Sequence, residues 1–241
     1  MRIHAKNSYK LSILLIFILF SGFIEARETN VVADFLKEIL TSENTGKTLV
    51  KPINELMTEL RGKDLYTFSH CLRVAKYSQT ISREMKLSEK EVEEISVNGL
   101  LHDIGKLAIS DSILKKPGKL TPEEFDQIKK HPKAGVEILQ KNSILVSYSK
   151  GAKEHHERWD GKGYPESLKG DQISLDGRII AVADSFDAMT SQRPYNKPKN
   201  LEEALREIEA QKGSQFDPGV VVAFSAAVKK GVISIMHQSS E

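Results

Sequence analysis

The residues best suited to chemistry lie in one short stretch, His102-Asp103-Ile104-Gly105-Lys106. A histidine beside an aspartate offers an imidazole nitrogen and a carboxylate, and both are good ligands for a divalent metal. The neighbouring groups could bind two metals, or the carboxylate could bridge a pair. Gly105 permits a close approach of the backbone, and Lys106 adds a positive charge suited to a phosphate. Because so short a motif recurs by chance, it gains weight only from the other histidines.

Seven histidines occur in the chain, and two of them, His4 and His237, lie in the terminal segments. A single histidine near a helix end is usually a core or surface residue, but five together, with Asp103 and Asp184, are harder to dismiss. The set supplies about seven nitrogen and oxygen ligands, too many for one tetrahedral zinc. It suits two metals bridged by a carboxylate, the arrangement used for in-line phosphoryl chemistry. These five are His70, His102, His131, His155 and His156.

Helices are predicted to position these side chains. Ser88 and the glutamate three residues later form a capping box that starts a helix running towards Leu101, so the His-Asp pair lies at its end. The apolar spacing also predicts a helix over Leu175 to Thr190, which carries Asp184 and Asp187. Since no convincing alternation of apolar and polar residues appears, the sequence predicts an all-α domain.

The part of the chain before Asp64 contains no evident chemistry. Apolar spacing predicts a helix over Val31 to Leu40, then a loop from Thr41 to Gly46 and a short helix from Pro52 to Leu60 that Gly62 ends. We therefore divide the chain beyond its first segment into a helical linker or N-terminal lobe (27–63), a helical domain (64–228) and a C-terminal tail (229–241).

The order of these residues resembles a known signature. His70, then His102-Asp103, then Asp184 resemble the H…HD…D pattern of the HD phosphohydrolase superfamily. The stretch from His155 to Pro165, HHERWDGKGYP, is similar to the Gly-Tyr-Pro loop of its HD-GYP family. The resemblance implies an HD-domain helical bundle with an extended Gly-Tyr-Pro loop. Further similar stretches are Asp64-Leu65-Tyr66-Thr67, Lys116-Pro117-Gly118, Ala183-Asp184-Ser185-Phe186-Asp187-Ala188 and Gln215-Phe216-Asp217-Pro218.

The resemblance also implies a role for each ligand. His70, His102, Asp103 and Asp184 would hold one metal, with Asp103 bridging to a second ion. His131, His155 and His156 would complete the second site. Some family members bind a third metal through a glutamate one turn before the first histidine, but this chain has Tyr66 there, so two divalent ions are expected. Mixed imidazole and carboxylate ligands favour iron or manganese over calcium, and zinc remains an alternative.

The candidate site predicts a metal-dependent phosphodiesterase, and the resemblance to the HD-GYP family implies that it hydrolyses cyclic di-GMP to pGpG or GMP. A water bridging two cations loses a proton near neutral pH and attacks phosphorus, while Lys106 stabilises charge on the phosphoryl oxygens. Arg193 could clamp a phosphate or a guanine edge or form a surface ion pair. Asp187 could orient Lys106 or relay a proton, or be a satisfied helix residue. Tyr164 could contact the substrate or a protein partner, unless its loop is merely a tight turn.

Two alternatives stay open at this stage. The same metal site could hydrolyse another cyclic dinucleotide or a nucleotide monophosphate. Alternatively, the domain could bind cyclic di-GMP, or dock a partner through the Gly-Tyr-Pro loop, with little catalysis. A nucleic-acid partner is not expected, because 35 basic residues nearly balance 33 acidic ones and no basic stripe with interleaved aromatics is present. The single cysteine, Cys71, excludes an intrachain disulfide, and its apolar helical setting predicts a buried structural thiol.

The first 26 residues differ from the rest. Basic residues precede an apolar run, with membrane contact expected through residues 11–24, and Ala26 offers a small residue for cleavage. The segment therefore predicts a signal peptide or a membrane anchor, and the domain would be exported or membrane-associated. Because cyclic di-GMP is made and used in the cytoplasm, the expected function instead favours a cytoplasmic domain. A misassigned start site or an inverted anchor would explain that location. An extracytoplasmic substrate is the third explanation.

Overall fold

The computed structural model describes residues 31–40, 43–192 and 197–236, and the side chains of 43–47 are not described. These residues are helical and contain no β-strand, apart from an isolated bridge between Lys212 and Phe216. The predicted all-α fold is therefore confirmed. The helices are 31–39, α2 (Glu43–Lys63), α3 (Leu65–Glu84), α4 (Glu89–Leu101), α5 (Asp111–Leu114), α6 (Pro122–Ile128), α7 (His131–Leu139), α8 (Lys150–Glu154), α9 (Leu175–Thr190), α10 (Leu201–Ala210) and α11 (Pro218–Lys229), with 3-10 turns η1 (Ile104–Ala108), η2 (Val146–Tyr148) and η3 (Gly170–Gln172).

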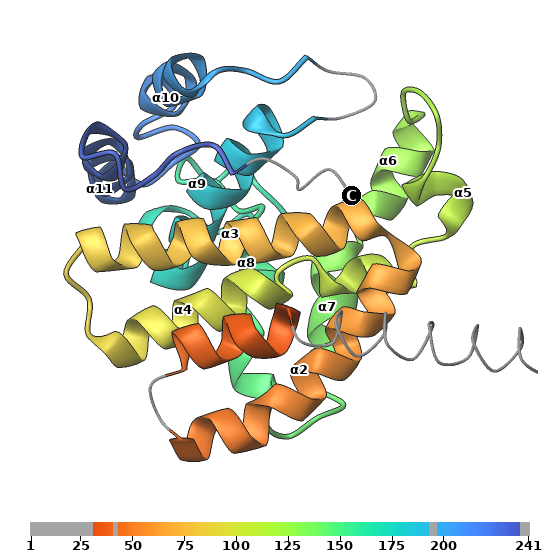
Figure 1. Cartoon of the computed structure of the whole chain (residues 1–241). Coiled ribbons are helices and arrows are strands. Elements are labelled where there is room, and N and C mark those ends of the chain that lie inside the picture. The colour runs from red at the N-terminus through yellow and green to blue at the C-terminus, as the bar shows by residue number, and fades with distance from the viewer. Residues whose placement is uncertain (1–30, 41–42, 193–196, 237–241) are drawn as a thin grey trace, which may run out of the picture.

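Helix α3 runs across the middle of the molecule and takes part in two apolar clusters (Figure 1). One of its faces packs Val74 and Tyr77 with α9, α10 and α11. Another face packs Phe68 and Cys71 with the helix at 31–39, α2, α4 and α7. Because α3 is buried on both sides, the polar side chains near its N-terminal end are held by a rigid frame.

Helix α2 is longer than the sequence predicts. The expected loop is wrong over 43–46, and the helix continues one residue past the expected stop at Gly62, because one helix runs from Glu43 through Pro52 to Lys63. Leu49, Ile53, Met57 and Leu60 are all buried along one face. Their burial outweighs the helix-breaking tendency of proline, which costs about 3 kcal/mol in a helix interior.

Side chains cap the helices that carry the site. Asp64 accepts hydrogen bonds from the backbone N–H groups of Tyr66 and Thr67 and so begins α3. The predicted capping box of Ser88 and Glu91 begins α4. These caps fix where each helix starts and hence which residues face the interior.

The flanking segments pack on the same body. The apolar cluster that contains Leu36 and Leu60 continues across residue 64 into α3 and α4. Near the C-terminus, the Tyr77 hydroxyl accepts a hydrogen bond from the Met236 N–H and donates one to the Ser234 carbonyl. Within the described ranges, no helix is both long and apolar enough to cross a membrane. The predicted signal or anchor at 1–26 lies outside those ranges and stays a prediction.

Candidate metal centre

The structure brings the predicted ligands into two neighbouring groups. The first, here called the mixed group, consists of His70, His102 and Asp184. The second, the three-histidine group, consists of His131, His155 and His156. Within each group the candidate ligand atoms all lie within 4.8 Å of one another. They come from α3 (His70), the residue after α4 (His102), the start of α7 (His131), the residues after α8 (His155, His156) and α9 (Asp184).

Asp103 lies between the two groups, and its two oxygens face different ones. Oδ2 is 3.6 Å from Nε2 of His70 and 3.4 Å from Nε2 of His102. Oδ1 is 3.3 Å from Nε2 of His131 and 3.9 Å from Nε2 of His155. A carboxylate with this orientation can bridge two cations, one on each side.

Four of the imidazoles are oriented by a hydrogen bond at Nδ1. In each, an N–H at Nδ1 donates to a carboxylate or a backbone carbonyl, so Nε2 is the nitrogen that faces the centre. Nε2 of His102 is buried and has no hydrogen-bond partner among the described residues, as expected of a group that binds a cation. The four pairs are His70 with Asp187 (2.7 Å), His102 with Gly99 (2.7 Å), His131 with Ile128 (2.7 Å) and His155 with Gly151 (2.8 Å).

Glycine at 105 allows the two groups to approach each other. A methyl group added there would collide with the backbone carbonyl oxygen of His131 and lie 2.5 Å from the backbone nitrogen of Gly135. The turn that carries Asp103 therefore packs directly on the first turn of α7. This contact is the physical reason for the glycine in the His-Asp motif.

The mixed group is a strongly charged environment. Burial alone would raise the pKa of Asp103, but the Lys106 ammonium, 2.6 Å from Oδ2, and the His102 ring hold it well below its usual range. Burial also opposes the charged form of His70, yet its hydrogen bonds to Asp184 and Asp187 raise the pKa of this ring to about 9. In the protein without metal, a proton on Nε2 of His70 thus occupies the place where a cation would bind.

The three-histidine group, in contrast, is an environment that favours uncharged imidazoles. Burial lowers the pKa of His131, and burial together with the neighbouring imidazoles lowers that of His155 much further. The pKa of His156 falls to about 4, mainly through burial. All three rings are therefore neutral near pH 7 and present lone pairs suited to iron, manganese or zinc.

Asp187 has a different environment from the one the sequence predicts. Its carboxylate is buried behind His70, where it also binds Arg73 through two hydrogen bonds of 2.6 and 2.9 Å. In the described part of the chain Asp187 makes no hydrogen bond or ion pair with Lys106, whose ammonium binds Asp103 instead. The predicted orientation of Lys106 by Asp187 is therefore corrected: α9 turns Asp187 towards α3.

The Gly-Tyr-Pro loop closes over the three-histidine group. The Tyr164 ring stacks on the His156 ring, with centroids 4.7 Å apart and an interplanar angle of 26°. Glu157, buried beneath the loop, accepts hydrogen bonds from the backbone N–H groups of Glu166 (2.7 Å) and Leu168 (3.0 Å). Sequence reasoning assigned no role to Glu157, because a loop carboxylate in isolation gives no signal of what it binds.

Three further predictions concern residues around the centre. Cys71 is buried as predicted, and burial raises the pKa of its thiol well above the usual value, so it stays protonated. Tyr66, one turn before His70, stacks on that ring with centroids 6.2 Å apart, and the expectation of two ions stays a prediction. Arg193 lies outside the described residues, so its predicted contact with substrate stays a prediction.

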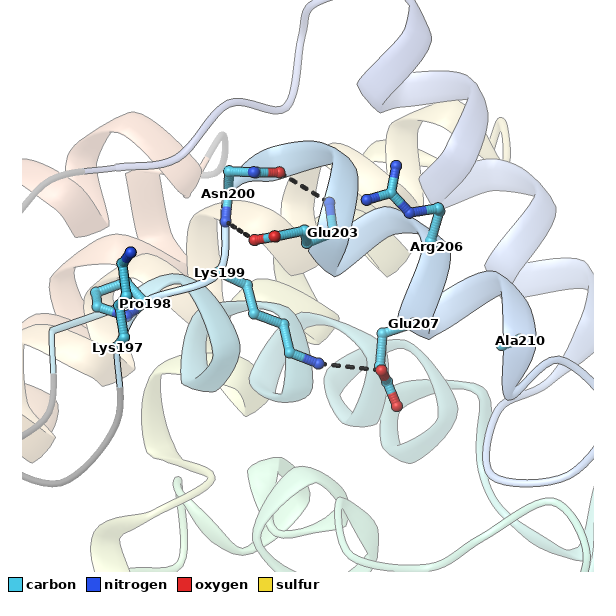
Figure 2. A pocket seen from close by; sticks show the side chains of 8 residues that line it. All are labelled: Lys197, Pro198, Lys199, Asn200, Glu203, Arg206, Glu207 and Ala210. Carbon is cyan, nitrogen blue, oxygen red and sulfur yellow. Dashed lines mark hydrogen bonds and ion pairs between the residues drawn. The ribbon is translucent and has the colours of Figure 1, made fainter.

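Two recesses are relevant to where a substrate could bind. A cavity of about 200 Å³ opens beside Asp184, His156 and Tyr164 and is therefore part of the candidate centre. A second recess, of about 650 Å³, lies on the outer face of α10 (Figure 2). There Lys199 is paired with Glu207 at 3.0 Å and Asn200 caps the helix, so these two polar side chains have local partners. The first cavity is the one that adjoins the chemistry.

Known proteins are similar to this chain in sequence and in fold. The HD domain family matches residues 47–220. A cyclic di-GMP phosphodiesterase of Thermotoga maritima is 48% identical over 193 residues, which make up 79% of this chain and 49% of that protein. The 3′3′-cGAMP-specific phosphodiesterase 2 of Vibrio cholerae is 42% identical over 179 residues, 73% of this chain and 34% of the relative.

The fold also matches a solved structure, the HDG"Y"P protein Bd1817 of Bdellovibrio bacteriovorus. The TM-score is 0.57 at 16% identity, over 83% of this chain and 70% of that one, which shows the fold alone. The chain belongs to the HD domain family, and the predicted resemblance is thus confirmed. It spans half or less of the length of the two curated relatives named above.

Proposed function

We propose that this chain is a metal-dependent phosphodiesterase that hydrolyses cyclic di-GMP to the linear dinucleotide pGpG, and with a second cleavage to GMP. The observation that carries the proposal is the orientation of Asp103, whose two oxygens face two separate groups of imidazole nitrogens. The names of relatives from T. maritima and V. cholerae support a phosphodiesterase and a cyclic dinucleotide substrate.

The donor set would hold two divalent ions, one at each group, and Asp103 would contribute an oxygen to each. Iron or manganese is favoured because neutral imidazoles are combined with carboxylates, and zinc is an alternative. When bound, the ions supply Lewis-acid stabilisation of the phosphoryl oxygens and activate a water for in-line attack. Asp103 would contribute to both sites, and His102 offers a buried Nε2 for which the described residues supply no hydrogen-bond partner.

Side chains around the centre would bind and orient the substrate. Lys106 is partly exposed, and its ammonium balances Asp103 while remaining within reach of a phosphoryl oxygen that carries developing charge. Tyr164, half-buried on His156, offers its ring to a nucleotide or to a protein partner. Arg193 remains the proposed clamp for a phosphate or a guanine edge.

A second substrate has specific support. Relatives at 42% and 39% identity are named as 3′3′-cGAMP-specific phosphodiesterases, and that compound differs from cyclic di-GMP in one base. We therefore propose cyclic di-GMP as the first candidate and 3′3′-cGAMP as the second. A binding module with little catalysis is disfavoured, because the full set of candidate ligands converges.

The test is turnover of both cyclic dinucleotides by the full chain loaded with Mn²⁺ or Fe²⁺, followed by separation of linear and mononucleotide products. The Asp103→Ala variant should lose about 10³-fold in rate, since it removes the shared charge of the centre. Asp126→Asn, which alters an exposed carboxylate on α6, is the matched control and should not change the rate. A metal-loaded wild type that cleaves neither compound would contradict the proposed function.

A further inference from the structure

Two carboxylates one turn apart on α9 bracket a single imidazole. Nε2 of His70 lies 3.1 Å from Oδ1 of Asp184, and Nδ1 lies 2.7 Å from Oδ2 of Asp187. The two aspartates share a helix face because they are three residues apart. Both side chains are carboxylates, so their surroundings must determine which of them is free to bind a cation.

The difference between them is a pair of neighbours that only Asp187 has. Arg73, three residues after His70 on α3, donates from Nε to Oδ1 of Asp187 (2.6 Å) and from Nη2 to Oδ2 (2.9 Å). The Ser191 hydroxyl accepts from Arg73 (3.1 Å) and donates to Asp187 (3.1 Å). Both Asp187 oxygens are therefore occupied, whereas the Asp184 side chain is 18% exposed and opens onto the cavity beside the centre.

The two helices do not need this pair to stay together. Apolar contacts already join α3 and α9, including the Tyr77 and Phe186 rings, whose centroids are 4.9 Å apart. A buried ion pair adds little net stability compared with apolar side chains of the same volume. Its geometry, two parallel hydrogen bonds that fix one carboxylate in one orientation, instead suits the positioning of a neighbouring ligand.

We propose that Arg73 and Asp187 are a positioning pair for the metal centre. Arg73 holds Asp187 against Nδ1 of His70, and the pair thereby directs Nε2 of His70, together with Asp184, towards a divalent cation in the mixed group. Both residues are buried, and neither lines the cavity beside the centre. The inference rests on the proposed metal site but not on the identity of the substrate.

The experiment is a titration of the full metal-free chain with Mn²⁺, in which the electron paramagnetic resonance signal of the free ion reports how much is bound. Arg73→Gln should weaken binding of one ion by about 10- to 100-fold, the usual effect of removing a group that orients a ligand. The ion at the three-histidine group should bind as in the wild type. Arg83→Gln, which alters an exposed arginine on the same helix, is the matched control and should change neither ion.

A double variant separates a positioning pair from two independent residues. If Arg73 acts through Asp187, then Asp187→Asn should weaken the same ion, and combining it with Arg73→Gln should cost no more than the larger single loss. Losses that add would overturn the proposal, as would wild-type binding in Arg73→Gln. A loss spread equally over both ions would also overturn it, because it would indicate general disruption.

A milder variant covers the case in which the loss of Arg73 prevents folding. Ser191→Ala removes one hydroxyl without leaving a charge unpaired, and it should weaken the mixed-group ion by about fivefold, the equivalent of one hydrogen bond. Unchanged binding in this variant would count against the pair. Failure of the substrate proposal and failure of this inference are distinguishable: a wild type that binds Mn²⁺ without cleaving a cyclic dinucleotide overturns the substrate, whereas intact binding in Arg73→Gln overturns the positioning pair.

Discussion

The mixed group and the three-histidine group lie on either side of one carboxylate, yet their imidazoles differ in protonation before a cation binds. In the mixed group, acidic side chains surround His70 and raise its pKa to about 9, so a proton must leave before a metal binds. In the three-histidine group, burial lowers the pKa of every ring, and the lone pairs are available at neutral pH. The difference shows that ligand type alone does not define a metal site, because the neighbours of each ligand set its protonation.

The largest expected effect comes from disabling one group at a time. His102→Ala and His155→Ala should each lower cyclic di-GMP hydrolysis by about 10³-fold, because each leaves the substrate with incomplete charge stabilisation. Each variant should still bind one ion, at the group that remains intact. Metal analysis and turnover of the two variants, with the exposed Glu123→Ala as control, check this. Loss of both ions in either variant would mean that the two groups are not separable.

The stability of the metal-free protein should depend on pH with opposite signs for the two groups. The folded pKa of His70 is raised from 6.5 to about 9, so its contribution is present below pH 6.5 and lost as the pH rises to 9. The folded pKa of His156 is lowered to about 4, so its contribution is present above pH 6.5 and lost as the pH falls towards 4. Each contribution is at most about 3 kcal/mol.

Urea unfolding across pH 4–9.5 measures both contributions. His70→Gln should flatten the free energy of unfolding on the alkaline side, and His156→Gln should flatten it on the acidic side. If either substitution flattened the free energy of unfolding equally at acidic and alkaline pH, the predicted difference between the two groups would be contradicted.

Metal affinity should distinguish the groups by its pH dependence. Because Nε2 of His70 must release a proton, binding at the mixed group should weaken about tenfold per pH unit below 9, or about 100-fold from pH 8.5 to 6.5. Binding at the three-histidine group should change little over that range, since its pKa values are lowered. Mn²⁺ titrations at three pH values measure this, and equal slopes for both ions would contradict the assignment.

A smaller effect is expected from the glycine that brings the groups together. Gly105→Ala should destabilise the fold by about 1–3 kcal/mol, because the added methyl group overlaps the backbone of α7. Gly62→Ala is the matched control: no atom of the described residues lies within 4 Å of the added group, and alanine in a helix should stabilise by about 0.5–1 kcal/mol. Free energies of unfolding in urea compare the two. Equal stability of both variants would show that the contact at Gly105 is not tight.

The candidate metal ligands could be predicted from the sequence, but the residues that orient them could not. The histidines and aspartates could be chosen because each type binds metals and their order matches a known signature. Arg73 and Glu157 were missed, because their roles depend on which segment folds against them. A signal existed for Arg73, which stands three residues after His70 as Asp187 stands three after Asp184. The continuous α2 was missed because burial of its apolar face overrides the local preference of Pro52.

The most direct test of the central claim is the spectrum of the Mn²⁺-loaded protein. If Asp103 bridges two ions, then about two Mn²⁺ bind per chain and their electron paramagnetic resonance signals show magnetic coupling, which Asp103→Ala abolishes. One bound ion, or two ions with independent uncoupled signals in the wild type, would contradict the shared centre.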